Sequence, residues 1–428
     1  MSSDKRKVFV VGLDAANLAH LHRLPRAADC TFHAALEIGD IRGVDHYDLP
    51  ALIDTAAQRM QANGPPSAVI AYFDFPASTL VPILAARFGL PGPSLRSVLE
   101  CEHKYWSRRQ QQTIIPEHIP RFRAFDPCSA TGGSGLPMPP PFWVKPIKSY
   151  RSYMGFLVND EPEFLACTAQ LCAHAGYIVE PFRALLRAYH MPADIADMPE
   201  TCLAESLIGG AQCTAEGYVW DGEPAIYGVV DSIRERDRSS FARYQYPCSL
   251  PTAVQQRMAD IACRAVRRSG LDNACFNAEL FWDQSIDHVW LLEINPRLSQ
   301  AHTEIFELVH GVSHHKHALD IALGYHPSPL PSTGSYPMAA NCHVRVFHDG
   351  RVKRVPSADE CRRVADEIPG TSVRVRVRRG QRLCELTNED SYSYEVANVF
   401  VGGADELELL EKYHRALDIL TFEIERTD

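Results

Sequence analysis

The sequence contains no apolar run that approaches the roughly 20 residues of a membrane-spanning helix. Its first residues, Met-Ser-Ser-Asp-Lys-Arg-Lys, are polar and lead directly into a strand-like segment at residues 8–11. They lack the apolar core and the cleavage site of a signal peptide. These absences favour a cytoplasmic protein without a membrane partner.

A basic excess is absent as well. The 43 lysines and arginines are outnumbered by 53 aspartates and glutamates, which gives a formal net charge of −10. This balance argues against a nucleic-acid partner and leaves small molecules as the expected ligands. A chain of 428 residues is too long for one ordinary core, so we expect about two to four domains.

Paired cysteines are also missing, since none of the 13 cysteines forms a Cys-x-x-Cys motif. We therefore expect reduced, mostly buried thiols and no zinc site. A histidine-rich stretch at residues 310–317 offers metal ligands in principle. Because no cysteine pair completes a ligand set, we expect the start of a helix with exposed imidazoles there.

Two common sequence signatures of enzymes are absent. No Gly-x-Gly-x-x-Gly follows the first strand, and no motif marks a nucleophilic serine or cysteine. The segment Gly12-Leu-Asp14 is explained by a tight turn as well as by a nucleotide loop. What the N-terminal part does show is an alternation of strand-like and helix-like segments, which predicts βα units and a parallel sheet. These segments are residues 8–11, 51–62, 67–73 and 80–88.

Two aromatic and branched segments, residues 276–283 and 288–297, are separated by four mostly polar residues and predict a β-hairpin. A symmetric loop pairs Glu279 with Glu293 and Asn277 with Asn295, all on one face, unless the pairing slips by one residue. Directly opposed residues place their Cβ atoms roughly 4.5–5.5 Å apart, so the two carboxylates repel each other. A hard divalent cation is the natural compensation. A shared proton or a solvated edge hairpin are the alternatives.

Three further charged residues lie in distinctive surroundings. Lys145 follows an apolar strand in Val144-Lys-Pro, Glu205 precedes Ser-Leu-Ile-Gly-Gly, and Lys104 lies on a helix. Taken singly, Lys104 is more typical of a solvated lysine and Glu205 of a plain strand carboxylate. These residues become informative about function when their order along the chain is considered together with the hairpin.

This ordered set resembles the ATP-grasp superfamily, and specifically its carboxylate–amine ligase members. The residues that carry the resemblance are Lys104, Lys145, Glu205, Glu279, Glu293, Asn295 and Arg297. The resemblance implies an α/β (α+β overall) fold with a Rossmann-like N-terminal domain, a two-lobed ATP-grasp and a small β-rich C-terminal domain. We place these at residues 1–95, 96–328 (lid lobe about 142–208) and 329–428.

The resemblance also implies a role for each residue. Glu279, Glu293 and Asn295 match the ligands of two Mg²⁺ ions (or Mn²⁺) that bridge the ATP phosphates. Lys104 and Lys145 match the lysines that reach those phosphates from the two lobes. Glu205 matches the acceptor of the adenine amino group, with the backbone of Leu207 or Ile208 beside it. Arg297 matches the arginine near the transferred phosphoryl group.

The sequence departs from the family pattern at two places. Gln212 stands where a glutamate usually binds the ribose, and a glutamine can accept at only one end. The phosphate loop at residues 149–155 is bulkier than usual; Ser152 is its candidate contact, and Arg151 or Lys148 are substitutes for backbone contacts. A further catalytic cation is expected after residue 230, with Arg234 and Arg236 as candidates and Arg238 and Arg243 as alternatives.

We therefore expect a C–N bond-forming ligase that phosphorylates a carboxylate with ATP, releases ADP and couples the acyl phosphate to an amine. A bicarbonate-dependent carboxylase of the same fold and a non-catalytic ATP-binding module are the alternatives. The identity of the acid and the amine and the role of residues 184–200 do not follow from the sequence. A homodimer is expected only as the commonest assembly.

Overall fold

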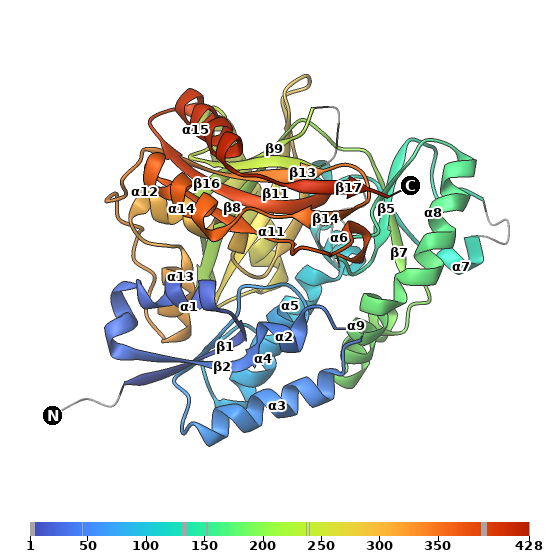
Figure 1. The fold of residues 1–428 in the computed structure, drawn as a ribbon. Helices are drawn as coiled ribbons and strands as arrows, with labels where there is room; N and C mark the ends of the chain where they lie inside the picture. Colours follow the sequence, from blue (N-terminus) through green and yellow to red (C-terminus); the bar gives the residue numbers. More distant parts are fainter. Residues whose placement is uncertain are drawn as a thin grey trace.

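The computed structural model describes residues 5–44, 46–130, 135–150, 153–236, 238, 240–386 and 392–427. An N-terminal unit lies beneath a large sheet, and a smaller lobe with helices α8 and α9 lies along one side of both (Figure 1). The expected mixed α/β class with a parallel N-terminal sheet is confirmed, and the other sheets of the described residues are antiparallel. None of the helices within the described ranges has the length and apolar character needed to cross a membrane.

The N-terminal unit is built on three parallel strands in the order β2-β1-β3. Its central strand is fully buried at Val8-Phe9-Val10-Val11, as a parallel strand covered on both faces should be. Strand β2 had not been expected from the sequence. The elements are β1 (Arg6–Leu13), α1 (Ala15–His22), η1 (Pro25–Asp29), β2 (Cys30–Glu37), α2 (Ile38–Ile41), α3 (Leu49–Ala62), β3 (Ala68–Ile70) and α4 (Ala77–Phe88).

A four-stranded antiparallel sheet in the order β4-β7-β5-β6 forms the core of the smaller lobe, which we call the lid. Residues 184–200 belong to its helical layer, where Leu185, Leu186 and Ile195 pack in one apolar cluster with Val144. The elements are β4 (Phe122–Phe125), α7 (Pro127–Ala130), β5 (Phe142–Pro146), β6 (Phe156–Val158), α8 (Glu161–His174), α9 (Gly176–Ala188), α10 (Ala193–Ala196) and β7 (Cys202–Ser206).

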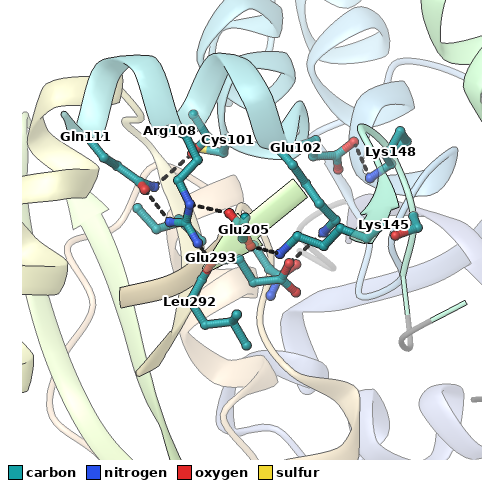
Figure 2. A pocket seen from close by; sticks show the side chains of 14 residues that line it. Cys101, Glu102, Arg108, Gln111, Lys145, Lys148, Glu205, Leu292 and Glu293 are labelled. Atoms are coloured by element: carbon teal, nitrogen blue, oxygen red, sulfur yellow. Dashed lines mark hydrogen bonds and ion pairs between the residues drawn. The ribbon is translucent and has the colours of Figure 1, made fainter. Parts of the chain in front are cut away.

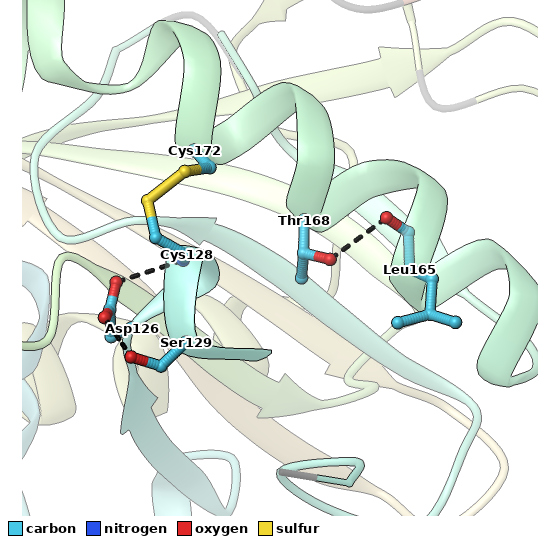
Figure 3. Close-up of a disulfide and its surroundings, with 6 residues drawn as sticks. All are labelled: Asp126, Cys128, Ser129, Leu165, Thr168 and Cys172. Atoms are coloured by element: carbon cyan, nitrogen blue, oxygen red, sulfur yellow. Dashed lines mark hydrogen bonds between the residues drawn. A yellow bond between two sulfur atoms is a disulfide. The ribbon is translucent and has the colours of Figure 1, made fainter. Parts of the chain in front are cut away.

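A disulfide between Cys128 and Cys172 joins α7 to α8 in the lid (Figure 3). The prediction that all cysteines are reduced is therefore wrong for this pair. The two residues are 44 positions apart, and sequence alone cannot give the connectivity of distant cysteines. The other 11 cysteines are free thiols, and most are buried.

The large sheet has eight strands in the order β12-β11-β8-β9-β10-β13-β16-β15, with antiparallel neighbours throughout. The C-terminal strands join it through β10 and β13, so the sheet continues across the expected boundary at residue 328. The strands are β8 (Ala211–Trp220), β9 (Glu223–Arg234), β10 (Phe241–Tyr246), β11 (Ala274–Asp283), β12 (His288–Asn295), β13 (Met338–Val346), β15 (Thr371–Val375) and β16 (Tyr394–Gly403).

Helices flank this sheet, and a two-stranded ribbon of β14 (Gly350–Arg354) and β17 (Glu423–Arg426) lies beside its C-terminal part. Helix α11 packs against the strands of the hairpin, and its apolar face contributes Met258, Ile261 and Val266 to their core. The remaining elements are α5 (Leu95–Glu102), α6 (Lys104–Gln111), η2 (Pro116–His118), α11 (Thr252–Ser269), η3 (Gln300–His302), α12 (Thr303–His310), α13 (His315–Ala322), α14 (Ala358–Glu367), η4 (Leu383–Glu385) and α15 (Glu406–Ile419).

The imidazoles that open α13 are buried rather than exposed, which corrects the sequence-based expectation. His314, His315 and His317 are each 0% exposed. They pack among aromatic rings, with His315 edge-on to Tyr72 and His317 against Tyr227. Burial lowers the pKa of all three, so they fill the space beneath the large sheet as neutral rings.

Candidate active site

The hairpin has the predicted register. Glu279 pairs with Glu293 and Asn277 with Asn295, and the pairing shifts by one residue only beyond Glu279. All four side chains line one cavity of about 640 Å³. The intervening Ala278 and the other inward residues of the hairpin pack into the apolar core on the opposite face, as the two-residue period of a strand requires.

Cations reach the same place from the lid and from α6. Lys104 Nζ lies 2.5 Å from Glu293 Oε2, and Lys145 Nζ lies 2.6 Å from Glu205 Oε2. Arg108 donates from Nε to Glu205 Oε1 at 2.6 Å (Figure 2). Its guanidinium also donates to the carbonyl of Leu292 at 2.5 Å, so it ties the lid sheet to the hairpin.

Arg108 was missed in the sequence, although a signal was present. It follows Lys104 by four residues on α6, and residues four apart project from the same side of a helix. Gln111 continues that side and accepts a hydrogen bond from Arg108 at 2.6 Å. A polar stripe of this kind on a helix next to a buried strand was a usable indication of a site.

Of the three buried acids, Glu279 differs from Glu205 and Glu293 in the direction of its pKa shift. Burial opposes the charge of Glu205, but Arg108 and Lys145 outweigh it and lower the pKa of that carboxyl to about 2. Burial and the charge of Glu293 raise the pKa of Glu279 to about 7. Burial also opposes the charge of Glu293, but Lys104 outweighs it, so the pKa of Glu293 is lowered. Two acids this close therefore resist being charged together unless another cation joins them.

The groups around Glu279 suit a hard metal ion. Its oxygens accept from the amides of Gln212 at 3.0 Å and Asn295 at 3.4 Å, so its hydrogen bonds to described residues come from neutral groups. Carboxylate oxygens and the Asn295 amide oxygen form a donor set of oxygen atoms, which matches Mg²⁺ or Mn²⁺. The three expected metal ligands thus lie together at the cavity wall.

The predicted arginines after residue 230 separate in space. Arg234 lines the cavity and donates to Gln212 Oε1 from Nε at 3.1 Å and from a terminal nitrogen at 2.5 Å. Arg236 is exposed and is not among the described residues that line the cavity. Ser152 lies outside the described residues, and Lys148 forms an ion pair with buried Glu102 at 3.0 Å.

The link from β7 to β8 passes over the end of the hairpin. Leu207 and Ile208 line the cavity there, between the lid and the large sheet. Gly210 has φ +115°, and a Cβ at this position would lie 2.1 Å from the carbonyl oxygen of Trp282. Only glycine satisfies both constraints, so Gly210 fixes the path of the connection from β7 to β8.

Arg297 is held by an acid from the N-terminal unit. Its Nε and a terminal nitrogen lie 2.9 Å and 2.7 Å from Asp74 Oδ1, in the turn between β3 and α4. Burial lowers the pKa of Arg297, but Asp74 outweighs it and the net shift is upward. Sequence analysis gave no sign of Asp74, because 223 residues separate the partners.

A separate group of potential metal ligands lies on the opposite face of β8. Cys213 Sγ is 3.4 Å from Asp231 Oδ1 and 3.7 Å from Cys248 Sγ. Its neighbours Gln212 and Thr214 line the cavity, whereas Cys213 packs in the core. This group is therefore not part of the candidate active site.

One protein-family model matches part of the chain. Residues 246–329 match the family model of the carbamoyl-phosphate synthase L chain ATP-binding domain. A search of curated protein sequences gave no match.

Solved structures match over nearly the whole chain. The L-amino acid ligase from Bacillus licheniformis has 16% identity and a TM-score of 0.73, with 99% of this chain and 100% of that chain covered. N5-carboxyaminoimidazole synthase from Aspergillus clavatus, in complex with ADP and an aminoimidazole ribonucleotide, has 14% identity and a TM-score of 0.64, covering 97% and 98%. The biotin carboxylase domain of the 2-oxoglutarate carboxylase from Hydrogenobacter thermophilus, with MgADP and bicarbonate, has 15% identity and a TM-score of 0.65, covering 99% and 92%. At these identities the likeness shows a shared fold.

Proposed function

We propose that the chain is a member of the ATP-grasp superfamily and that it is an ATP-dependent ligase that joins a carboxylate to an amine with release of ADP. The facing acids Glu279 and Glu293, which line one cavity together with Lys104 and Arg297, carry this proposal. Phosphoryl transfer is catalysed mainly by positioning and by charge neutralisation, and the cavity offers both. The ligase of B. licheniformis, whose fold spans the full chain, supports the acid–amine class.

In this proposal Glu279, Glu293 and Asn295 hold Mg²⁺. The bound metal neutralises charge on the ATP phosphates and orients them. Lys104 and Lys145 bind the same phosphates, and Glu205 fixes Lys145 by the ion pair described above. Both oxygens of Glu205 already accept from cations, so the backbone of Leu207 and Ile208 is the main contact for adenine, with Glu205 beside it.

In this proposal Arg297 acts on the reacting groups directly, whereas Arg234 acts through a neighbouring side chain. The guanidinium of Arg297 orients the substrate carboxylate towards the γ-phosphate and then holds the planar acyl group, since a fork of donors suits such oxyanions. Asp74 keeps the arginine in place. Arg234 acts through Gln212, which it orients towards Glu279 and the ribose. Arg236, being exposed, has a place here only if it approaches when the substrates bind.

The test is product analysis with ATP, Mg²⁺ and a panel of carboxylic acids and amines. The proposal requires ADP, inorganic phosphate and an amide in equal amounts, dependent on both substrates. Formation of AMP and pyrophosphate would overturn the acyl-phosphate route. Tight ATP binding without turnover across the panel would instead support a non-catalytic nucleotide-binding module.

A bicarbonate-dependent carboxylase is the second candidate, because a biotin carboxylase domain with bicarbonate shares the fold. ADP release that depends on bicarbonate rather than on an organic acid would favour it. We further propose a cytoplasmic enzyme and a homodimer, which the carboxylase domain forms. Size-exclusion chromatography with light scattering would determine the assembly.

A further inference from the structure

A histidine that sequence analysis did not single out lies in the wall of the cavity, next to a buried acid. His302 is 1% exposed and ends the single turn η3, five residues after Arg297. Its Nδ1 lies 2.7 Å from Glu216 Oε1. Glu216 is 0% exposed and also accepts from the backbone nitrogen of Ser299 at 3.2 Å. The acid therefore fixes both the ring and the loop that carries it.

The other nitrogen of this ring is unsatisfied. His302 Nε2 is buried and has no hydrogen-bond partner among the residues that the structure describes. A carboxylate only accepts hydrogen bonds, so Nδ1 carries the proton and Nε2 presents its lone pair. A buried polar atom without a partner is costly unless something else binds it. Because His302 lines the cavity, a substrate bound there could supply this partner.

The position of Glu216 in the sheet places this histidine near the row of side chains next to the paired acids. Two rows of side chains cross the strands on the cavity face. One contains Thr214, Glu279 and Glu293, and the next contains Glu216, Asn277 and Asn295. Rows on the same face of a sheet are about 7 Å apart along the strands. Glu216 thus anchors its partner one row away from the paired acids, on the side where Arg297 also enters.

We infer that His302 is the general base that deprotonates the amine substrate, with Glu216 as its positioning residue. This inference rests on the proposed ligase function and names the class of its second substrate. That substrate is an aliphatic amine, which arrives protonated at neutral pH and cannot attack until it loses a proton. An imidazole held by a carboxylate is suited to this transfer.

The step balances as follows. One proton moves from the ammonium nitrogen to His302 Nε2, and Glu216 stabilises the resulting imidazolium. The freed electron pair forms the C–N bond at the carbonyl carbon of the acyl phosphate. The bond from that carbon to the phosphate oxygen breaks, and its electron pair leaves with inorganic phosphate. The second proton of the nitrogen goes to the departing phosphate.

The test compares two nucleophiles in His302→Gln, using an acid and an amine that the wild type couples. Hydroxylamine is already uncharged at neutral pH, so it captures the acyl phosphate as a hydroxamate without a base. The variant should lose about 10²-fold or more in amide synthesis, yet retain hydroxamate formation within a few-fold. Its remaining amide synthesis should rise about tenfold per pH unit, following the fraction of free amine.

Two further variants guard the interpretation. Glu216→Gln preserves the size of the side chain and removes the charge, and it should lower amide synthesis about tenfold with hydroxamate formation retained. His414→Gln, on the exposed side of α15, should match the wild type in both assays. Thermal melting checks that each variant is folded.

Each outcome decides the question. Equal losses of amide and hydroxamate in both His302→Gln and Glu216→Gln would show that the pair only supports the loop, and the inference would be wrong. Undiminished amide synthesis in His302→Gln would also overturn it. If the wild type forms no hydroxamate with any acid, the proposed ligase function itself fails, and the inference fails with it.

Discussion

The lid and the large sheet face the same cavity with differently balanced charges. The lid contributes Lys145 and Glu205, which neutralise each other and are completed by Arg108 from α6. The large sheet contributes Glu279 and Glu293, and of these only Glu293 has a cation partner among the described residues, namely Lys104. The negative charge in the lid is thus compensated by nearby cations, whereas the hairpin carries more negative charge than its cation partner compensates.

This difference separates an acid whose charge is already compensated from one whose charge is not. The pKa of Glu205 is lowered to about 2, because Arg108 and Lys145 outweigh its burial. The pKa of Glu279 is raised to about 7 by burial and by Glu293. A buried acid with a lowered pKa is already paired, while one with a raised pKa has no cation close enough to outweigh burial and its acidic neighbour. Variants in each set should therefore affect different properties.

The largest expected effect is on turnover, from the acidic set. Glu293→Gln removes one of the proposed metal ligands and should reduce ADP formation on the order of 10³-fold, because in the proposed mechanism the phosphates would lose both their cation and its position. A steady-state ADP assay measures it, with Glu411→Gln on the surface of α15 as the control. Melting temperature should change little. Full activity would rule out the assigned metal role.

The next effect is on stability, from the lid set. Arg108→Met should lower the free energy of unfolding by about 3 kcal/mol, because it leaves Glu205 with one cation and the Leu292 carbonyl without its donor. Arg109→Met is the matched control on the same helix. Its partner Asp194 is exposed, so the loss should stay below about 1 kcal/mol. Urea unfolding measures both, and equal losses would contradict the contrast.

A smaller effect should come from adding charge to the acidic set. Gln212→Glu replaces the donor to Glu279 with a third carboxylate, which should cost about 1 kcal/mol of stability without metal. Mg²⁺ should recover part of this loss, because a cation relieves the repulsion. Thermal shift with and without Mg²⁺ reports it. A variant more stable than the wild type without metal would show that Arg234 dominates at this position.

The smallest effect concerns a histidine and two acids outside the lid and hairpin sets, and it serves as a reference for the effects of those two sets. His20 of α1 lies between Glu304 and Glu307 of α12. Burial opposes its charge, but hydrogen bonds to the two acids outweigh it and raise the pKa of His20. Its contribution is therefore complete below the ordinary histidine pKa and is lost as pH rises through the raised one.

The measurement is the melting temperature of the wild type and His20→Gln from about pH 6 to about pH 9. The gap between them should be a few degrees at the acidic end and should close at the alkaline end. A gap that stays constant would show that His20 acts through packing alone.

The parts of the site that could be read from the sequence are those set by local rules. The pairing of Glu279 with Glu293 follows from the two-residue period of strands and a symmetric loop. Arg108 could have been found from its helical spacing after Lys104. Asp74 and the pair Glu216–His302 depend on how distant segments meet, which no period encodes. The Cys128–Cys172 bond was missed for the same reason. Buried imidazoles in α13 were misjudged because tertiary packing overrides the polar character of a stretch.

The hydrogen bonds between Arg297 and Asp74 have a consequence for how this protein can be recombined. The arginine stands on the hairpin side and its acid on a turn of the N-terminal unit. A chimaera that takes the N-terminal unit from a relative must also supply an acid at this turn. Without it, the chimaera would leave the largely buried guanidinium of Arg297 in the cavity wall without its acid, which is destabilising. The two units are therefore best exchanged only as a matched pair.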